Sequence, residues 1–394
     1  MDFKAAAVIA EYNPFHSGHA RHIERTRDAG ATHVVAVMSG DFVQRGDCAC
    51  VSKWTRAEMA LSGGVDLVVE LPVAWAVSGA ERFALGGVAL ADALGCVSLL
   101  SFGSEGGDAD RLLEVAALLE SPAFGETLRP WLDAGLTFAD ARQRACEQLL
   151  PDCGRLLRAP NDALAIEYCR ALNRLGSAME PLCVRREGAM HDDAPADGIA
   201  SASHLRRLLA DGGDASPFMP EAAYRFLSEA TGRGEAPALL ERLDRTVLYA
   251  LRTADPSALA ALPDLSEGLE NRIAACAREA VSFAGLCDSV KVKRYTHARI
   301  RRVALSAVLG LTADSGSGTP PYIRVLAMNA LGRELLSRAR PTLPVVTRRA
   351  DVERLDERCH AVFALGMRAA DIFALCTPEV QPCGSDAAHG VIVR

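Results

Sequence analysis

The feature that most constrains the fold is one short segment, residues 6–19, which reads AAVIAEYNPFHSGH. An apolar stretch of strand length runs into a turn marked by Asn13 and Pro14, and helical spacing follows over about residues 19–29. In an open parallel sheet, ligands bind where a strand meets the next helix, because the backbone N–H groups there favour an anion. Gly18 lets a phosphate approach the backbone closely. The segment therefore predicts a phosphate-binding strand–turn–helix unit.

Two histidines, His16 and His19, stand at this junction. Their imidazoles supply hydrogen-bond donors that can follow the charge developing on a phosphoryl group, so we predict both as catalytic residues. The alternative is that they only cap a helix. The strand before them and the helix after them favour the catalytic interpretation. The pattern resembles the HxGH signature of the nucleotidyltransferases that adenylylate substrates with ATP.

Strands and helices alternate over residues 1 to about 210, with further apolar runs of strand length at 33–38, 65–71, 97–102 and 182–185. This order predicts an α/β fold with a Rossmann-like, mostly parallel sheet. From about residue 215 helical spacing dominates, and only residues 343–346 suggest a lone strand. We therefore predict two domains. They are a Rossmann-like nucleotidyltransferase domain over 1–212 and a mainly α-helical C-terminal domain over 213–394, with a tail that is poorly ordered from residue 377.

The loop after the second predicted strand carries Gln44 and Arg45 and leads to Lys53. Loops at the carboxyl ends of strands hold functional residues in α/β proteins. These three side chains are therefore candidates to face a substrate carboxylate or phosphate. The alternative, which spacing alone favours, is that Arg45 and Lys53 are solvated surface charges.

A second phosphate-binding position is predicted where a helix begins near residue 203. Ser201 and Ser203 precede this helix, and Arg206 lies on its first turn. Such an arrangement can hold nucleotide phosphates opposite the first strand's site. Ordinary capping by a serine is the alternative, and capping and phosphate binding are compatible.

A basic stretch, residues 291–302, stands out in the helical half, because six of its twelve residues are Lys or Arg. The whole chain has a net charge of −7, so contact with nucleic acid must come from a local patch of this kind. A phosphate backbone selects such a patch, and an aromatic ring within it can stack on an unpaired base. The alternative is a solvated helix face that balances acidic neighbours. The candidate contacts are Lys293, Arg294, Tyr295, Arg299 and Arg302.

The composition is that of an ordinary soluble protein, with 394 residues, 49% of them hydrophobic and 24% charged. This length allows two or three domains. The sequence contains no signal-peptide pattern and no apolar run of membrane-spanning length, so we expect a cytoplasmic protein without a membrane partner.

Several segments, taken together and in order, resemble the bacterial tRNA(Met) cytidine acetate ligases. The likeness runs through the N-terminal half and reappears in the basic stretch and around residue 321. It is specific because the ordered set is shared, not one motif alone. The segments are EYNPFHSGH (11–19), MSGDFVQRG (38–46), VSKW (51–54), FGSE (102–105), PND (160–162), RREGA (185–189), SASHLR (201–206), residues 293–302 and PYIRVL (321–326).

This resemblance implies that acetate is activated by ATP to acetyl-adenylate. The acetyl group then passes to N4 of the wobble cytidine (position 34) of elongator tRNA(Met), giving N4-acetylcytidine. It also implies that the first domain binds ATP and acetate and that the second domain binds tRNA. Mg²⁺ on the ATP phosphates is expected from phosphoryl chemistry, although no residue in the sequence identifies itself as its ligand.

The resemblance further implies that the segment from Ile9 to His22 cradles ATP, with Gly103, Asn161 and Arg186 completing the nucleotide site. Ser17 stands where the family often has Asn, and Ser203 where Thr is usual, which leaves the phosphate contacts at these positions open. With the helix start near residue 203 included, the predicted ATP site comprises Ile9, Ala10, Glu11, Tyr12, Asn13, Pro14, Phe15, His16, Ser17, Gly18, His19, His22, Gly103, Asn161, Arg186, Ser201, Ser203 and Arg206.

Two other functions stay open on the sequence. One is a nucleotidyltransferase that adenylylates a small cofactor precursor, although such an enzyme would not need half of its chain as a helical domain with a basic face. The other is a non-catalytic RNA-binding factor that keeps a nucleotide pocket for regulation. Acetate-dependent exchange between ATP and pyrophosphate separates the three, because only the ligase shows it.

Overall fold

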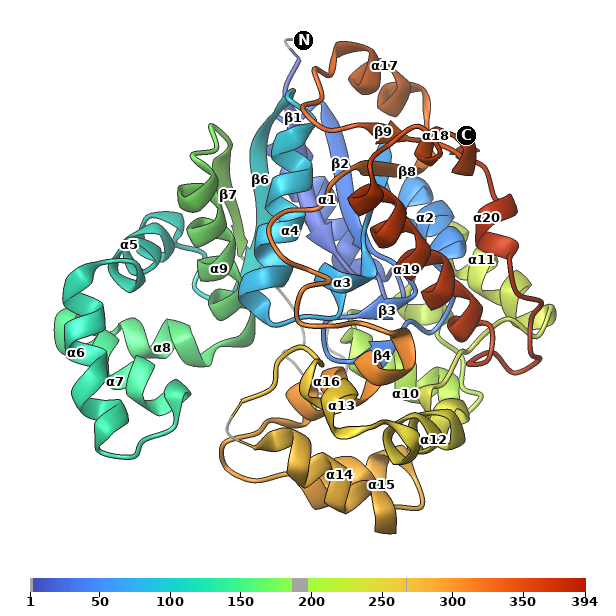
Figure 1. Cartoon of the computed structure of the whole chain (residues 1–394). Coiled ribbons are helices and arrows are strands. Elements are labelled where there is room, and N and C mark those ends of the chain that lie inside the picture. The colour runs from blue at the N-terminus through green and yellow to red at the C-terminus, as the bar shows by residue number, and fades with distance from the viewer. Residues whose placement is uncertain (1–2, 186–197, 267) are drawn as a thin grey trace.

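The computed structural model describes residues 3–185, 198–266 and 268–394. Its main sheet contains β1 (Ala5–Ala10), β2 (His33–Ser39), β5 (Leu67–Leu71), β6 (Val97–Ser104), β7 (Glu180–Arg185), β8 (Ile323–Met328), β9 (Val345–Val346) and β10 (Ile392–Val393). The strand order is β10-β8-β5-β2-β1-β6-β7, with β9 also on β8 (Figure 1). Neighbouring strands are parallel except β5 and β8, which are antiparallel. The predicted α/β fold with a mostly parallel sheet is confirmed.

The inner strands are mostly apolar because helices cover both faces of the sheet. Along β1, Ala7 and Ile9 join a core that includes Phe83, whereas Val8 joins a second core that includes Ile23. The first core contains α3 (Val73–Ala76), α4 (Ala80–Ala93) and α9 (Pro160–Leu175), and the second contains α1 (Ser17–Asp28) and α2 (Lys53–Ser62).

Two groups of helices lie outside these layers (Figure 1). One is inserted between β6 and α9 and consists of α5 (Ala109–Leu119), α6 (Pro122–Asp133), α7 (Phe138–Leu149) and α8 (Cys153–Arg158). The other follows β7 and includes α10 (Ala202–Ala210), η1 (Ser216–Phe218), α11 (Glu221–Gly232), η2 (Leu240–Leu243), α12 (Asp244–Thr253), α13 (Pro256–Ala260), α14 (Leu269–Glu279), α15 (Phe283–Val290) and α16 (His297–Leu309). Within the described residues, no helix combines the length and apolar character that a bilayer crossing requires.

The last part of the chain returns to the sheet, which the predicted boundary between residues 212 and 213 does not allow for. β8 pairs with β5, β9 and β10 pair with β8, and α17 (Ala330–Arg338), α18 (Arg349–Val352), α19 (Glu357–Phe373) and α20 (Ser385–Ala388) lie between them. The helices from α12 to α16 are therefore an excursion between two parts of one sheet domain, and the second predicted domain is not wholly helical.

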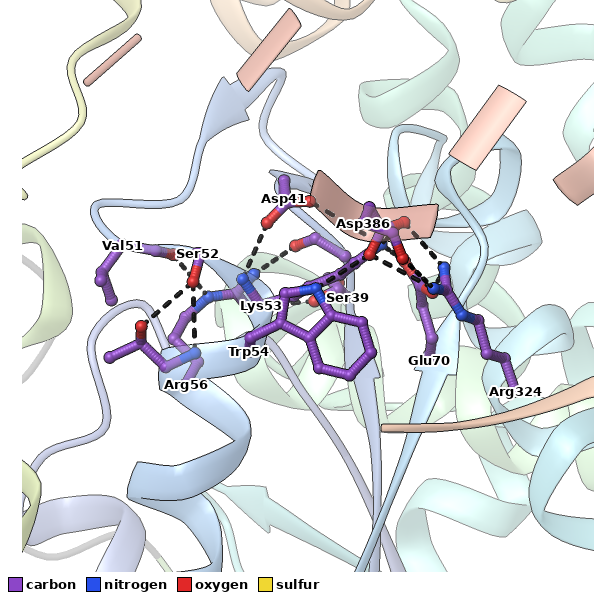
Figure 2. A network of polar contacts seen from close by, with 12 residues as sticks. Ser39, Asp41, Val51, Ser52, Lys53, Trp54, Arg56, Glu70, Arg324 and Asp386 are labelled. Atoms are coloured by element: carbon purple, nitrogen blue, oxygen red, sulfur yellow. Dashed lines mark hydrogen bonds and ion pairs between the residues drawn. The ribbon is translucent and has the colours of Figure 1, made fainter. Parts of the chain in front are cut away.

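The predicted disorder of the tail is also wrong, because buried charges and a strand pair fix it (Figure 2). Asp386 of α20 is 3% exposed, and its carboxylate binds Lys53 Nζ at 2.8 Å and Arg324 Nη1 at 2.9 Å. Trp54 donates from Nε1 to the same carboxylate at 2.9 Å, and its ring stacks on His389 with centroids 3.8 Å apart. A tail held by such contacts is part of the folded domain.

Candidate functional site

A cavity of about 290 Å³ lies at the carboxyl end of β1, where the chain turns into α1. The lining comes from this turn, one face of α1, the loop after β2, the ends of β6 and β7, α9 and residues 199–202. The sequence-predicted residues that line it are Ile9, Ala10, Glu11, Tyr12, Asn13, His16, Gly18, His19, His22, Gln44, Arg45, Gly103 and Asn161.

His16 and His19 lie at the start of α1 with stacked rings, whose centroids are 3.7 Å apart. His16 is the N-cap, because its Nδ1 accepts a hydrogen bond from the Gly18 N–H at 3.1 Å. The His16 N–H in turn donates to Nδ1 of His19 at 3.2 Å. Since both Nδ1 atoms accept, a neutral ring at either position carries its proton on Nε2. Both imidazoles are thus fixed as Nε2–H donors, and both line the cavity.

One face of α1 lines the cavity beyond the histidine pair. Gly18, Arg21, His22 and Arg25 follow the i, i+3, i+4, i+7 spacing of a helix face. His22 Nε2 lies 2.9 Å from the hydroxyl of Ser101 on β6, which holds this face against the sheet. Arg21 and Arg25 were missed in the sequence, although their spacing from Gly18 is a signal that identifies them.

The backbone of the turn is held from behind by Arg56, a side chain with no exposed surface. Its Nη1 donates to the carbonyl oxygens of Glu11 at 2.6 Å and Ser39 at 3.0 Å, and Nε donates to Val51 at 3.0 Å. Nη2 donates to Gly40. The guanidinium therefore ties the carboxyl ends of β1 and β2 together. Sequence reasoning missed this residue, because nothing local distinguishes it from a surface arginine on α2.

The residues predicted at the start of α10 support the turn instead of lining the cavity. Arg206 Nη1 donates to the carbonyl oxygen of Asn13 at 2.9 Å. Ser201 is the N-cap of α10 and accepts from the His204 N–H at 3.2 Å. In the described part of the chain, Ser201, Ser203 and Arg206 are not among the cavity-lining residues. The capping interpretation therefore holds for Ser201, and Arg206 positions the backbone.

Three other predicted residues also serve the architecture around the cavity. Phe15 is fully buried, with its ring centroid 4.9 Å from that of Tyr12. Ser17 donates from Oγ to the carbonyl oxygen of Phe218 at 2.9 Å, which holds the start of α1 against η1. Pro14 follows Asn13 through a cis peptide bond. Arg186 lies outside the described residues.

Asn161 reaches the cavity from the first turn of α9. Its Nδ2 donates to Glu105 Oε1 at 2.6 Å, and the Asp162 N–H donates to Glu105 Oε2 at 2.9 Å. Asp162 Oδ1 accepts from the Glu105 N–H at 2.8 Å, so the bonds are reciprocal. Burial alone would raise the pKa of Glu105, but the hydrogen bonds from Asn161 and Asp162 outweigh it and lower the pKa. These hydrogen bonds, made by the ionised Glu105, hold the first turn of α9 against the loop that follows β6.

The charged lining of the cavity favours an anion. Among the described residues it comprises one carboxylate, Glu11, against the arginines Arg21, Arg25, Arg45 and Arg185. The apolar part of the lining is formed by Val8, Ile9, Phe83, Phe102, Leu164, Tyr168 and Val184. A flat apolar group bearing several negative charges fits this division.

Lys53 differs from both of its sequence interpretations. It is 1% exposed and does not line the cavity in the described part of the chain. Its Nζ lies 2.8 Å from Glu70 Oε1 and 2.8 Å from Asp386 Oδ2 (Figure 2). Burial alone would lower the pKa of Lys53, but the two carboxylates outweigh it and raise the pKa. A buried ammonium needs such partners, so this lysine is structural.

Much of the basic stretch is engaged within the protein. Tyr295 is 6% exposed, and the Arg299 guanidinium covers its ring at 5.4 Å. The predicted stacking of Tyr295 on a base is therefore wrong. Arg299 Nε donates to the carbonyl oxygen of Asp264 at 2.8 Å, and Arg302 Nε donates to Asp264 Oδ2 at 2.8 Å. These contacts hold α16 to the loop before α14.

Lys293 and Arg294 precede α16 in this stretch. They lie at the tip of a tight turn in which the Tyr295 N–H donates to the Val292 carbonyl oxygen at 3.1 Å. Both side chains are exposed. This tip presents two adjacent positive charges to solvent.

The comparisons with known proteins agree along nearly the whole chain. Residues 3–386 match the model of the HIGH nucleotidyl transferase family. The chain is 36% identical over 398 residues to the tRNA(Met) cytidine acetate ligase of Thermoanaerobacter sp. (strain X514), with 98% of each chain covered. It is 33% identical to that of Acetivibrio thermocellus, covering 99% of this chain and 100% of the other. The structure resembles that of Thermotoga maritima TmcAL bound with alpha-thio ATP, with a TM-score of 0.93 and 32% identity over 99% of both chains.

Proposed function

This chain belongs to the HIGH nucleotidyl transferase family and, within it, to the tRNA(Met) cytidine acetate ligases, and on that premise we propose that it acetylates tRNA. The proposed enzyme is an ATP-dependent ligase that forms acetyl-adenylate from acetate and ATP. It then transfers the acetyl group to N4 of the wobble cytidine of elongator tRNA(Met) and releases AMP. We place the reaction in the cytoplasm, where ATP, acetate and tRNA occur.

The observation that carries this proposal is the pair of stacked histidines at the start of α1. Backbone hydrogen bonds hold both rings as Nε2–H donors, in a cavity whose other charges are mostly positive. The helix N-terminus adds further N–H groups and a favourable dipole. The solved relative that holds an ATP analogue supports ATP as the occupant.

In the first step, a carboxylate oxygen of acetate attacks the α-phosphorus of ATP. The new O–P bond forms as the bond from phosphorus to the bridging oxygen breaks, and pyrophosphate leaves with that electron pair. Negative charge grows on the phosphoryl and leaving oxygens. His16, His19 and the N-terminus of α1 stabilise this charge, while Arg21 and Arg25 attract the departing pyrophosphate. No nucleophilic side chain is needed.

In the second step, the N4 amine of the cytidine attacks the acetyl carbonyl carbon. The bond from this carbon to the phosphate oxygen breaks, AMP leaves with the electron pair, and N4 gives up one proton. Acetyl-adenylate is a mixed anhydride, and AMP leaves from it with negative charge on its phosphate. The donors that stabilise negative charge in the first step therefore also stabilise this leaving phosphate.

Mg²⁺ fits this site as a partner of the nucleotide. No group of three or more His, Cys, Asp and Glu side chains that could hold a metal occurs among the described residues. Magnesium commonly keeps several waters and binds substrate phosphates with only one or two protein carboxylates. Glu11 is the carboxylate at the cavity, and the ion would neutralise charge on the triphosphate.

For the tRNA, we propose Lys293 and Arg294 as the contacting residues of the basic stretch. Both side chains are exposed at a turn tip, whereas Arg299 and Arg302 bind Asp264. An ammonium and a guanidinium group at a tip suit the phosphate backbone, which contributes affinity and register.

The deciding experiment is incubation of the purified protein with ATP, labelled acetate and total tRNA, followed by nucleoside analysis. Label in N4-acetylcytidine, together with acetate-dependent exchange between ATP and pyrophosphate, is the expected result. Exchange that depends on a cofactor precursor in place of acetate, or nucleotide binding without any exchange, would overturn the proposal.

A further inference from the structure

The loop that joins β3 (Phe42–Val43) to β4 (Asp47–Cys48) contacts two parts of the molecule at once. On one side, Gln44 and Arg45 line the cavity. On the other side, the loop lies against α16, the helix that follows the exposed basic tip (Figure 1). This short loop is therefore a physical link between the helical excursion and the cavity.

Gly46 shows how close the link is. Its φ of +71° is a left-handed conformation that favours glycine. A Cβ atom added there would lie 2.6 Å from the backbone nitrogen of Arg302 and 2.8 Å from the carbonyl carbon of Arg301. Since both contacts are to backbone, neither neighbour can swing aside. The loop backbone thus rests directly on the backbone of α16.

Side chains of α16 complete the contact. Arg302, whose side chain is 13% exposed, donates from Nη1 to the carbonyl oxygen of Gln44 at 3.4 Å while Nε is held by Asp264 at 2.8 Å. Arg301 lies 3.7 Å from the carboxylate of Asp47 at the other end of the loop. Two adjacent arginines of α16, Arg301 and Arg302, therefore contact the two ends of the loop.

On the cavity side, the contact is made by the backbone N–H of Gln44. The Gln44 N–H donates to Glu11 Oε1 at 3.0 Å. Gln44 is thus fixed between Arg302, which takes its carbonyl oxygen, and Glu11, which takes its N–H. A continuous path of contacts runs from Asp264 through Arg302 and Gln44 to Glu11 at the end of β1.

We propose that Arg302 and Gly46 are positioning residues for adenylate formation, which hold Gln44 and Arg45 at the cavity from the helical excursion. This inference rests on the proposed function, because it concerns the acetate-activating step. It assigns to α16 a part in the first half-reaction, in which no tRNA takes part. A misplacement of about 1 Å can cost roughly a hundredfold in rate, so a loosened loop is enough to impair the reaction.

The test uses the full chain and measures acetate-dependent ATP–pyrophosphate exchange without tRNA. The variants are Arg302→Ala, Arg302→Lys and Gly46→Ala. Arg272→Ala is the matched control, because Arg272 also donates to two backbone carbonyls, those of Val290 and Ser289 at 2.7 and 2.8 Å, within the helical excursion. The affinity for alpha-thio ATP and the thermal unfolding midpoint are measured for each protein.

We expect kcat/KM for exchange to fall at least tenfold in Arg302→Ala and Gly46→Ala, with partial rescue in Arg302→Lys and no change in the control. The analogue affinity should change less than threefold, because most of the lining comes from residues other than Gln44 and Arg45. Wild-type exchange in both variants would overturn the inference. An equal loss of analogue affinity, or a loss explained by unfolding in both variants, would also overturn it. Absence of exchange in the wild-type protein would instead refute the proposed function.

Discussion

His16 has two tasks that depend on different nitrogens of one ring. Its Nδ1 caps α1 by accepting from the Gly18 N–H, and its Nε2 carries the proton that the proposed reaction uses. Of the two interpretations that the sequence left open, the helix cap is therefore confirmed, and the catalytic donor is compatible with it because it uses the other nitrogen. A substitution that keeps the cap and removes Nε2 separates them.

We expect His16→Asn to lower acetate-dependent exchange by roughly 10²–10³, the usual effect of losing one such donor. The free energy of unfolding should stay near that of the wild type, because asparagine is a good N-cap, whereas His16→Ala should also lose about 1 kcal/mol. Exchange rates and urea unfolding of both variants give the comparison. An asparagine variant with near-wild-type exchange would show that the ring is only a cap.

At the residue scale, the sequence predicted site residues that belong to a local motif. It missed residues whose role depends on partners far away in the sequence. His16 and His19 line the cavity, as their local motif predicts, and Asn161 lines it, as the family resemblance implies. Lys53 was misjudged because its partner Asp386 lies 333 residues away in the sequence. A charged residue looks solvated in a sequence unless the carboxylate that buries it is known.

Among the elements, α2 is unusual because its first residue, Lys53, is a buried lysine. Lys53 and Arg324 share the carboxylates of Glu70 and Asp386, which joins α2, β5, β8 and α20 (Figure 2). Burial alone would raise the pKa of Asp386, but Lys53 and Arg324 outweigh it and hold the pKa at about 2. The tail is thus fixed electrostatically.

We expect Asp386→Asn to lower the free energy of unfolding by about 3 kcal/mol at pH 7, because the buried Lys53 and Arg324 then lose the carboxylate that lies nearest to both besides Glu70. A depressed pKa stabilises the fold above the unfolded value near 3.9, and this contribution is lost as the pH falls towards about 2. The difference between variant and wild type should therefore shrink across that window in urea unfolding.

The control is Asp371→Asn. Asp371 also holds the tail, accepting from the Gly384 N–H at 2.6 Å, but in an exposed position. Its loss should cost less than about 1 kcal/mol. A stability difference for Asp386→Asn that is equally small, or constant down to pH 2, would contradict the electrostatic account.

The turn tip at Lys293 and Arg294 is the element that we propose to contact tRNA. Replacing both residues with alanine should weaken tRNA binding and reduce the log–log salt slope by roughly 0.7–0.9 for each phosphate that is no longer neutralised. Exchange without tRNA should be unaffected, because neither side chain lines the cavity in the described part of the chain. Binding across a salt series, with Arg348→Ala, the N-cap of α18, as an exposed control, tests this. An unchanged salt slope would show that Lys293 and Arg294 are solvated surface charges that do not contact tRNA.

For the molecule as a whole, β1, β2, β5 and β6 could be predicted because each is a mostly apolar run that a helix follows. β8 and β10 could not be placed in the same way. β8 has an apolar pattern but pairs antiparallel with a strand made much earlier, and β10 has only two residues. Pairing across such separations leaves no local signal, so the predicted domain boundary falls too early in the chain.

We expect residues 1–212, produced alone, to aggregate, even though they contain the whole lining of the cavity. In this fragment β5 lacks β8, so a fully buried and mostly apolar strand becomes an open edge. Size-exclusion chromatography and circular dichroism of the fragment, compared with the full chain, provide the measurement. A monomeric fragment with cooperative unfolding would show that the first predicted domain folds independently.

The late arrival of β8 also matters during protein synthesis. Glu70 on β5 and its partner Arg324 on β8 are 254 residues apart. At roughly 5–20 residues per second, a ribosome takes on the order of 10–50 s to make the intervening chain. For that time the nascent β5 edge has nothing from its own chain to pair with. Shielding by a chaperone, or a pause that keeps neighbouring nascent chains apart, would therefore improve the yield of this protein more than any change near its cavity.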